Sequence, residues 1–138
     1  MSFIESYKRL DKLCGDLLKE DRRLTAYIEA MYDTPRGSFY VPSWENDLKR
    51  LKHYRWVRNQ IAHEPGCTEQ NMCTAEDVAW LNAFYDRILH QTDPLAQYRK
   101  ATQSKQPTAP KSPSSGGCAT VFCFIAAVLV AAALFFLL

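Results

Sequence analysis

The sequence lacks most of the patterns that identify enzymes of the common classes. Only five of its 138 residues are glycine, and they form no glycine-rich loop of the kind that cradles a phosphate. No serine stands in the pattern of a nucleophile elbow, and no two carboxylates have an informative spacing. These absences leave the corresponding enzyme classes with little support.

Apolar runs are absent from the first residues, and charge is absent from the last ones. The start of the chain has no apolar stretch typical of a signal peptide. Residues 118–138 contain no charge and no Pro, Asn or Gln. At a rise of about 1.5 Å per residue, a helix of that length spans roughly 30 Å, the thickness of a bilayer's hydrocarbon core. We therefore expect a single C-terminal transmembrane helix, a tail anchor, at residues 118–138.

This anchor predicts a single-pass membrane protein whose N-terminal domain is cytoplasmic. Basic residues precede the expected span, as the positive-inside tendency requires: Arg99, Lys100, Lys105 and Lys111. Residues 101–117 contain three prolines, two glycines and no large apolar residue, a composition that cannot build a core and indicates a flexible linker. About 100 residues remain, which is enough for one compact domain at residues 1–100.

The domain is expected to be all-α, a compact four-helix bundle, because apolar residues recur at helical spacing and no segment is a convincing strand. The first helix begins with Ser2 and Glu5 at capping-box spacing, and a second, at 24–33, could continue it. A long third helix follows Ser43, and a fourth begins with a Thr74–Asp77 capping box. Pro94 is expected to limit this last helix.

The cysteines give no clear sign of a metal or a disulfide. Cys14, Cys67 and Cys73 would be reduced in a cytoplasmic domain. His63, Cys67 and Cys73 lack the Cys-x2-Cys spacing of a zinc knuckle and a clear fourth ligand. We therefore expect no bound metal and no cofactor.

The long helix contains one residue that its apolar pattern does not explain. At about 100° per residue, its apolar side chains form one stripe, and Arg58 lies near the middle of that stripe. A guanidinium cannot lose its charge, so burying it requires a partner or a polar cleft. Either Arg58 pairs with a buried carboxylate, which is a structural role, or it binds an anion at a site.

The residues around Arg58 favour a site. Arg58-Asn59-Gln60-Ile61-Ala62-His63 resembles the signature of the HEPN superfamily, an Arg followed by a polar residue and, four to six positions after the Arg, by a His. The resemblance covers residues 1–100 in helix order, and only the six motif residues are specific. It implies an all-α domain that pairs with a second copy so that two motifs face each other. It also implies a metal-independent ribonuclease, although some members only bind or dimerise.

The motif provides the groups needed to cleave RNA by transesterification from the 2′-hydroxyl. His63 would act as general base or acid, Arg58 would stabilise the phosphate charge, and Asn59 would bond the phosphate or orient the imidazole. One imidazole does not readily perform both proton transfers, so a homodimer is expected.

A local basic patch predicts an anionic partner, although the net charge is only +2. The residues expected to bind RNA are Lys49, Lys52, Arg55 and Trp56. The basic residues could equally form a solvated face. Trp56 has no core to enter on its side of the helix, so it could stack on a base or belong to a subunit interface.

The expected function is thus a membrane-anchored, HEPN-like, metal-independent endoribonuclease. Its expected partners are RNA, the membrane, a second copy and an inhibitory protein. Two alternatives stay open. In one, a membrane-tethered HEPN-like adaptor uses Arg58 and His63 to hold a dimer and cleaves nothing. In the other, a small structural membrane protein only recruits a cytoplasmic partner.

Overall fold

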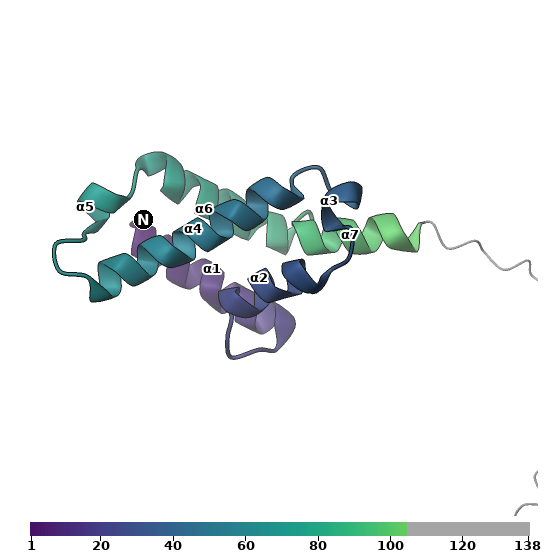
Figure 1. The fold of residues 1–138 in the computed structure, drawn as a ribbon, viewed down its shortest axis with the longest axis horizontal. Helices are drawn as coiled ribbons and strands as arrows, with labels where there is room; N and C mark the ends of the chain where they lie inside the picture. The colour runs from purple at the N-terminus through teal and green to yellow at the C-terminus, as the bar shows by residue number, and fades with distance from the viewer. Residues whose placement is uncertain (105–138) are drawn as a thin grey trace, which may run out of the picture. The chain divides into compact units, whose positions relative to one another are not determined.

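The computed structural model describes residues 1–104, which belong to one compact unit. The described residues are helical with no strand among them, so this part of the chain is all-α. Its helices are α1 (Phe3–Leu18), α2 (Leu24–Asp33), α3 (Gly37–Tyr40), α4 (Trp44–His63), α5 (Glu69–Met72), α6 (Ala75–Leu89) and α7 (Pro94–Gln103). Figure 1 shows α4 running along the bundle, with α3 beside its first residue and α5 near its last.

The two capping boxes lie where the sequence predicts them. Ser2 accepts a hydrogen bond from the Glu5 backbone while the Glu5 carboxylate accepts one from Ser2, and Thr74 and Asp77 do the same at the start of α6. Each pair satisfies two N–H groups that have no partner within the helix. Glu69 of α5 adds a long-range cap, because its carboxylate accepts the N–H groups of Phe3 at 2.9 Å and Ile4 at 3.3 Å. This contact joins α5 to the start of α1.

The suggestion that α2 continues α1 is wrong. Lys19 and Arg23 both have positive φ, 56° and 51°, and the chain turns between them. Asp11 holds the turn from within α1, because its carboxylate accepts the N–H of Leu24 at 3.1 Å. The sequence between the helices contains neither Gly nor Pro, so nothing in it marks this break.

Pro94 has the opposite role to the one expected. It begins α7 at the first helical position, where its missing N–H and fixed φ cost nothing. Asp93 caps the helix by accepting the N–H of Ala96 at 3.3 Å. The domain boundary expected after residue 100 falls inside this helix, which ends at Gln103.

The core lies between α1, α2, α4 and α6, and polar pairs are buried around it. Tyr27 and Phe84 meet edge to face in the middle, with ring centroids 5.8 Å apart. Asp47 is only 2% exposed, and Arg87 donates to its carboxylate at 3.0 and 2.7 Å, tying α6 to the first turn of α4. Tyr27 donates to Asp93 at 2.6 Å, tying α2 to the start of α7.

The predicted fold, a four-helix bundle with a transmembrane helix, is wrong, and so is the single-pass membrane localisation. Among residues 1–104, no helix is both long enough and apolar enough to cross a membrane. Even α4, the longest at 20 residues, bears charged side chains along most of its length. The segments on which these predictions rested, the linker from residue 105 onward and the anchor at 118–138, lie outside the described residues.

Candidate functional site

Helix α4 has an unusual distribution of charge. Its two acids, Glu45 and Asp47, lie in the first turn, and Asp47 is buried against Arg87. From Leu48 to His63 the helix contains no acid, while it has five lysines and arginines. The helix ends at His63, before Pro65 and Gly66. Most of α4 is therefore a cationic element, and only the orientation of each side chain decides what it can bind.

Arg58 lies on the core-facing side of α4, near the C-terminal end of the helix. The residue is half-buried, and its charge acts on a tyrosine of α1. Burial raises the pKa of Tyr7 of α1 to about 12, and the positive charge of Arg58 opposes that rise. Among residues 1–104 no carboxylate pairs with Arg58; its guanidinium donates to the Asn59 side chain at 3.1 Å. The structural role that the sequence left open, pairing with a buried acid, belongs to Arg87.

Asn59 and His63 are both exposed and lie on one face of α4, one turn apart. Within the described residues the His63 imidazole has no hydrogen bond, so it is open to a substrate. Arg58 and His63 are five positions apart, which turns their side chains roughly 140° away from each other around the helix axis. None of the five surface cavities found in residues 1–104 is lined by Arg58, Asn59 or His63. Within one chain Arg58 contacts Asn59, but no hydrogen bond joins either of them to His63 among residues 1–104.

His63 and Asn59 instead belong to a continuous exposed stripe of α4. Helix geometry places its members within an arc of about 80°. These members, the α4 stripe, are Lys49, Lys52, Trp56, Asn59 and His63, and all are exposed. Three of the residues predicted to bind RNA lie on the stripe. The fourth, Arg55, lies beside it, half-buried, and donates to Thr25 of α2 at 3.4 Å.

Two aromatic residues beside the α4 stripe were not predicted. The Lys52 ammonium lies 5.3 Å from the ring centroid of Tyr32, at the end of α2. The His53 ring stacks on Trp56 with centroids 5.9 Å apart and an interplanar angle of 28°. His53 could have been found from its three-residue spacing to Trp56. Tyr32 could not, because only tertiary packing places it beside Lys52.

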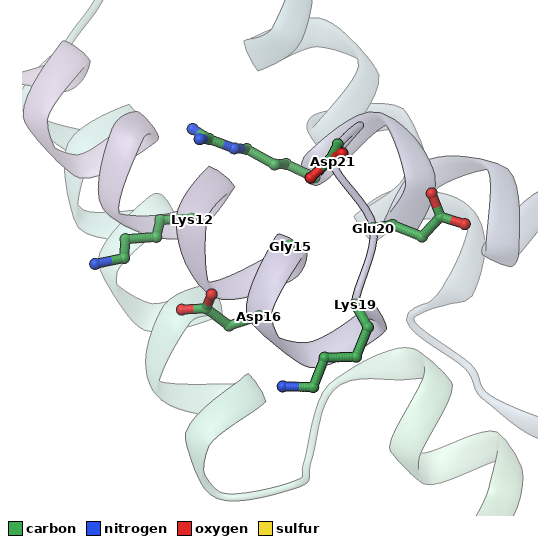
Figure 2. Close-up of a pocket in the computed structure, with 7 residues that line it drawn as sticks. Lys12, Gly15, Asp16, Lys19, Glu20 and Asp21 are labelled. Carbon is green, nitrogen blue, oxygen red and sulfur yellow. The ribbon is translucent and has the colours of Figure 1, made fainter.

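Another surface cavity of the described residues is formed by segments far from this stripe in the sequence. It has a volume of about 440 Å³ and is lined by residues of α1 and the turn to α2: Lys12, Gly15, Asp16, Lys19, Glu20, Asp21 and Arg23. Figure 2 shows its labelled side chains spreading outward without converging. Three acids and three bases line it, so it offers no net charge to an anionic or a cationic ligand.

The cysteines and histidines do not assemble into a cluster in this part of the chain. No group of three or more His, Cys, Asp or Glu side chains among residues 1–104 could hold a metal ion. Burial raises the pKa of the Cys73 thiol to about 11, an effect that Asp77 and Glu69 reinforce. Cys73 is therefore a weak nucleophile and a weak metal ligand at neutral pH.

The fold and the α4 stripe define a small all-α domain with an open cationic, aromatic face. Over residues 1–120, the chain matches a family that is described as a family of unknown function (DUF6548), and it belongs to that family. No curated protein and no solved structure matches it. Nothing in the family match links the chain to HEPN domains, so that relationship stays a prediction.

Proposed function

We propose that this protein is a HEPN-like, metal-independent endoribonuclease that binds RNA along the α4 stripe and cleaves it beside His63. One observation carries the proposal. Arg58 is a half-buried residue of α4 whose guanidinium contacts no carboxylate among residues 1–104 and donates instead to the exposed Asn59 side chain. A surface guanidinium without an acidic partner is available to an anion, and a bound phosphate would supply that partner.

The chemistry follows from the residue types. His63 takes the proton from the 2′-hydroxyl, whose oxygen attacks the adjacent phosphorus, and the 5′-oxygen leaves with a proton from a second acid. Arg58 stabilises the extra negative charge of the five-coordinate phosphate, for which bidentate guanidinium geometry is suited. Asn59, which accepts from Arg58 at 3.1 Å, holds that guanidinium in place. The products are a 2′,3′-cyclic phosphate and a free 5′-hydroxyl.

The geometry of α4 favours two copies at each reaction centre. The positions of Arg58 and His63 are roughly 140° apart around the helix axis, and within residues 1–104 the Arg58 guanidinium contacts Asn59 and not His63. A second copy, related by a two-fold axis near the end of α4, would supply the second imidazole and close the site around the phosphate. An inhibitory partner protein would act by covering the same end of α4.

The first test is cleavage of single-stranded RNA by the purified full chain in the presence of EDTA. We expect His63→Ala and Arg58→Ala each to lose about 10²- to 10⁴-fold in rate, since removal of a positioned acid–base or charge-stabilising group typically costs that much. His90→Ala is the matched control, because His90 is also an exposed histidine at a helix C-terminus. It should cleave at the wild-type rate. Asn59→Ala should have a smaller defect than either.

The second candidate function is a non-catalytic HEPN-like dimerisation or adaptor module. It is favoured by the same divergence of Arg58 and His63, because residues on two faces of a helix end can hold two partners without forming a site. Equal cleavage by wild type and His63→Ala at equal thermal stability would remove the nuclease proposal. A dimer that dissociates in Arg58→Ala, measured by sedimentation, would then support the adaptor.

A further inference from the structure

Large aromatic side chains are exposed on the α4 stripe and on the end of α2 beside it. Tyr32 is 57% exposed and Trp56 is 51% exposed, although both lie next to well-packed helices. Exposed aromatic area of this size is unfavourable in water, so it is informative where several rings gather. The core beneath is complete, since Met31 and Leu51 beside them are buried. Neither ring is needed to fill it.

These rings alternate with positive charge. Lys52 lies between them, with its ammonium 5.3 Å from the Tyr32 ring, and Trp56 follows one helical turn later, about 6 Å along the axis. His53 stacks on one face of Trp56, so a base would stack on the other face of that ring. The Tyr32 ring, the Lys52 ammonium and the Trp56 ring therefore follow one another, and Lys49 lies one helical turn before Lys52.

Acidic side chains do not interrupt this arrangement on α4. Glu45 precedes Lys49 by one turn, and the next acid, Glu64, follows His63. On the α2 side, Glu29 is engaged by Arg22 and Asp33 is exposed beside Tyr32. The α4 stripe is therefore positive over the length that carries Trp56, while Asp33 is an exposed acid on the α2 side.

We propose that Tyr32 and Trp56 are stacking platforms for two bases of a single-stranded RNA, whose phosphates lie on Lys49 and Lys52. This inference rests on the proposed function and specifies its substrate, since the strand then runs along α4 toward His63. Single strands expose the faces of their bases, which stack on aromatic rings regardless of sequence. A duplex hides those faces and offers only its phosphates.

The test is equilibrium binding, separated from cleavage by the choice of probe. A fluorescently labelled 12-nucleotide 2′-O-methyl RNA has no free 2′-hydroxyl, so it cannot undergo the proposed transesterification. Fluorescence anisotropy with the full chain should show tight binding of the single strand and weaker binding of the same strand in a duplex. Tyr32→Ala and Trp56→Ala should each weaken single-strand binding about 5- to 150-fold, the range for loss of one stacked base.

Conservative and control variants separate stacking from folding. Tyr32→Phe keeps the ring and should bind as the wild type does. Phe39→Ala removes a ring that is 74% exposed and lies next to Tyr40, which contacts Tyr98 of α7; it should leave binding unchanged. Lys52→Gln should weaken binding of all sequences and reduce the slope of log K against log salt by about 0.7.

The outcomes distinguish this inference from the proposed function. Loss of binding in Tyr32→Ala without any RNA cleavage by the wild type would support the platform and remove the nuclease. Cleavage by the wild type with unchanged probe binding in both alanine variants would overturn the platform and leave the nuclease standing. Equal affinity for the duplex would also overturn it. A wild-type dimer that Trp56→Ala converts to a monomer, without a change in probe binding, would overturn it as well. The surface around Trp56 would then be an interface between copies.

Discussion

Asp47 shows how much one buried charge depends on its partner. Its carboxylate is 2% exposed and receives two hydrogen bonds from Arg87 at 3.0 and 2.7 Å. Arg87 also reaches the Ser43 hydroxyl at 3.4 Å. The Arg87 guanidinium is itself partly desolvated, which lowers its pKa, but the hydrogen bonds and charge of Asp47 outweigh that effect and raise it. The pair fixes α6 against the start of α4.

We predict that Arg87→Ala lowers the free energy of unfolding by about 3–5 kcal/mol, because it leaves the Asp47 carboxylate buried and unpaired. Chemical denaturation of the full chain measures this change. Arg22→Ala is the matched control, since Arg22 pairs with Glu29 at the surface. It should cost less than about 1 kcal/mol. The double variant Arg87→Met/Asp47→Leu should regain most of the lost stability; an equally unstable double variant would contradict this explanation.

At the scale of elements, a short helix is held in place by the cap it provides. Helix α5 has only four residues, too few to be stable alone. Its Glu69 carboxylate accepts the N–H groups of Phe3 and Ile4, where the partial positive charge of the α1 N-terminus favours an anion. The segment after α4 is thereby attached to the first turn of α1.

Glu69→Ala should therefore weaken the first turn of α1 and cost about 0.5–2 kcal/mol, the usual range for a lost helix cap. Hydrogen exchange of the Phe3 and Ile4 amides should accelerate more than exchange at the centre of α6. Glu76→Ala provides the comparison, because Glu76 is an exposed acid in the first turn of α6. Unchanged exchange at Phe3 in Glu69→Ala would show that Ser2 and Glu5 suffice as the cap.

At the scale of the whole domain, buried tyrosines predict how stability depends on pH. Burial raises the pKa of Tyr7 to about 12, and burial together with the hydrogen bond to Asp77 raises that of Tyr54 to about 12. Burial and the nearby Asp93 carboxylate raise the pKa of Tyr27 well above its usual value. In the unfolded chain these phenols lose their protons near pH 10. The folded state retains these phenolic protons to a higher pH, so at high pH it binds more protons than the unfolded chain does.

Stability should therefore be fully present below about pH 10 and decline as pH rises toward 12. Thermal unfolding of the full chain between pH 8 and 12 measures this decline. Tyr7→Phe should make the decline shallower. Tyr27→Phe should do so too, but it should also lose about 1–3 kcal/mol at neutral pH, because Asp93 is left without its buried donor. A melting temperature that stays constant to pH 12 would contradict the prediction.

The sequence by itself determined that the domain is helical and where several of its helices begin or end. Periodic apolar residues, the Ser2–Glu5 and Thr74–Asp77 capping boxes, and the break after His63 are local signals, and local signals are read directly from neighbouring residues. The motif residues Arg58, Asn59 and His63 and the exposure of Trp56 were also predicted from α4 alone. The sequence could not show the turn at Lys19–Arg23 or the position of α5, because long-range contacts stabilise both. The role of Pro94 was available locally, since Asp93 is a helix N-cap and Pro suits the first helical position after it.

Only the tertiary structure decided which charges are paired and which are open. Nothing in the sequence distinguishes Asp47 from the other acids. It is the buried partner of Arg87 because α6, 40 residues further along the chain, packs against the first turn of α4. Arg58, near the other end of α4, contacts no carboxylate among the described residues and is therefore the candidate for a phosphate. Packing of α2 on α4 likewise places Tyr32 beside Lys52. Local periodicity determines the face on which a residue lies, but only packing between distant segments determines what lies opposite that face.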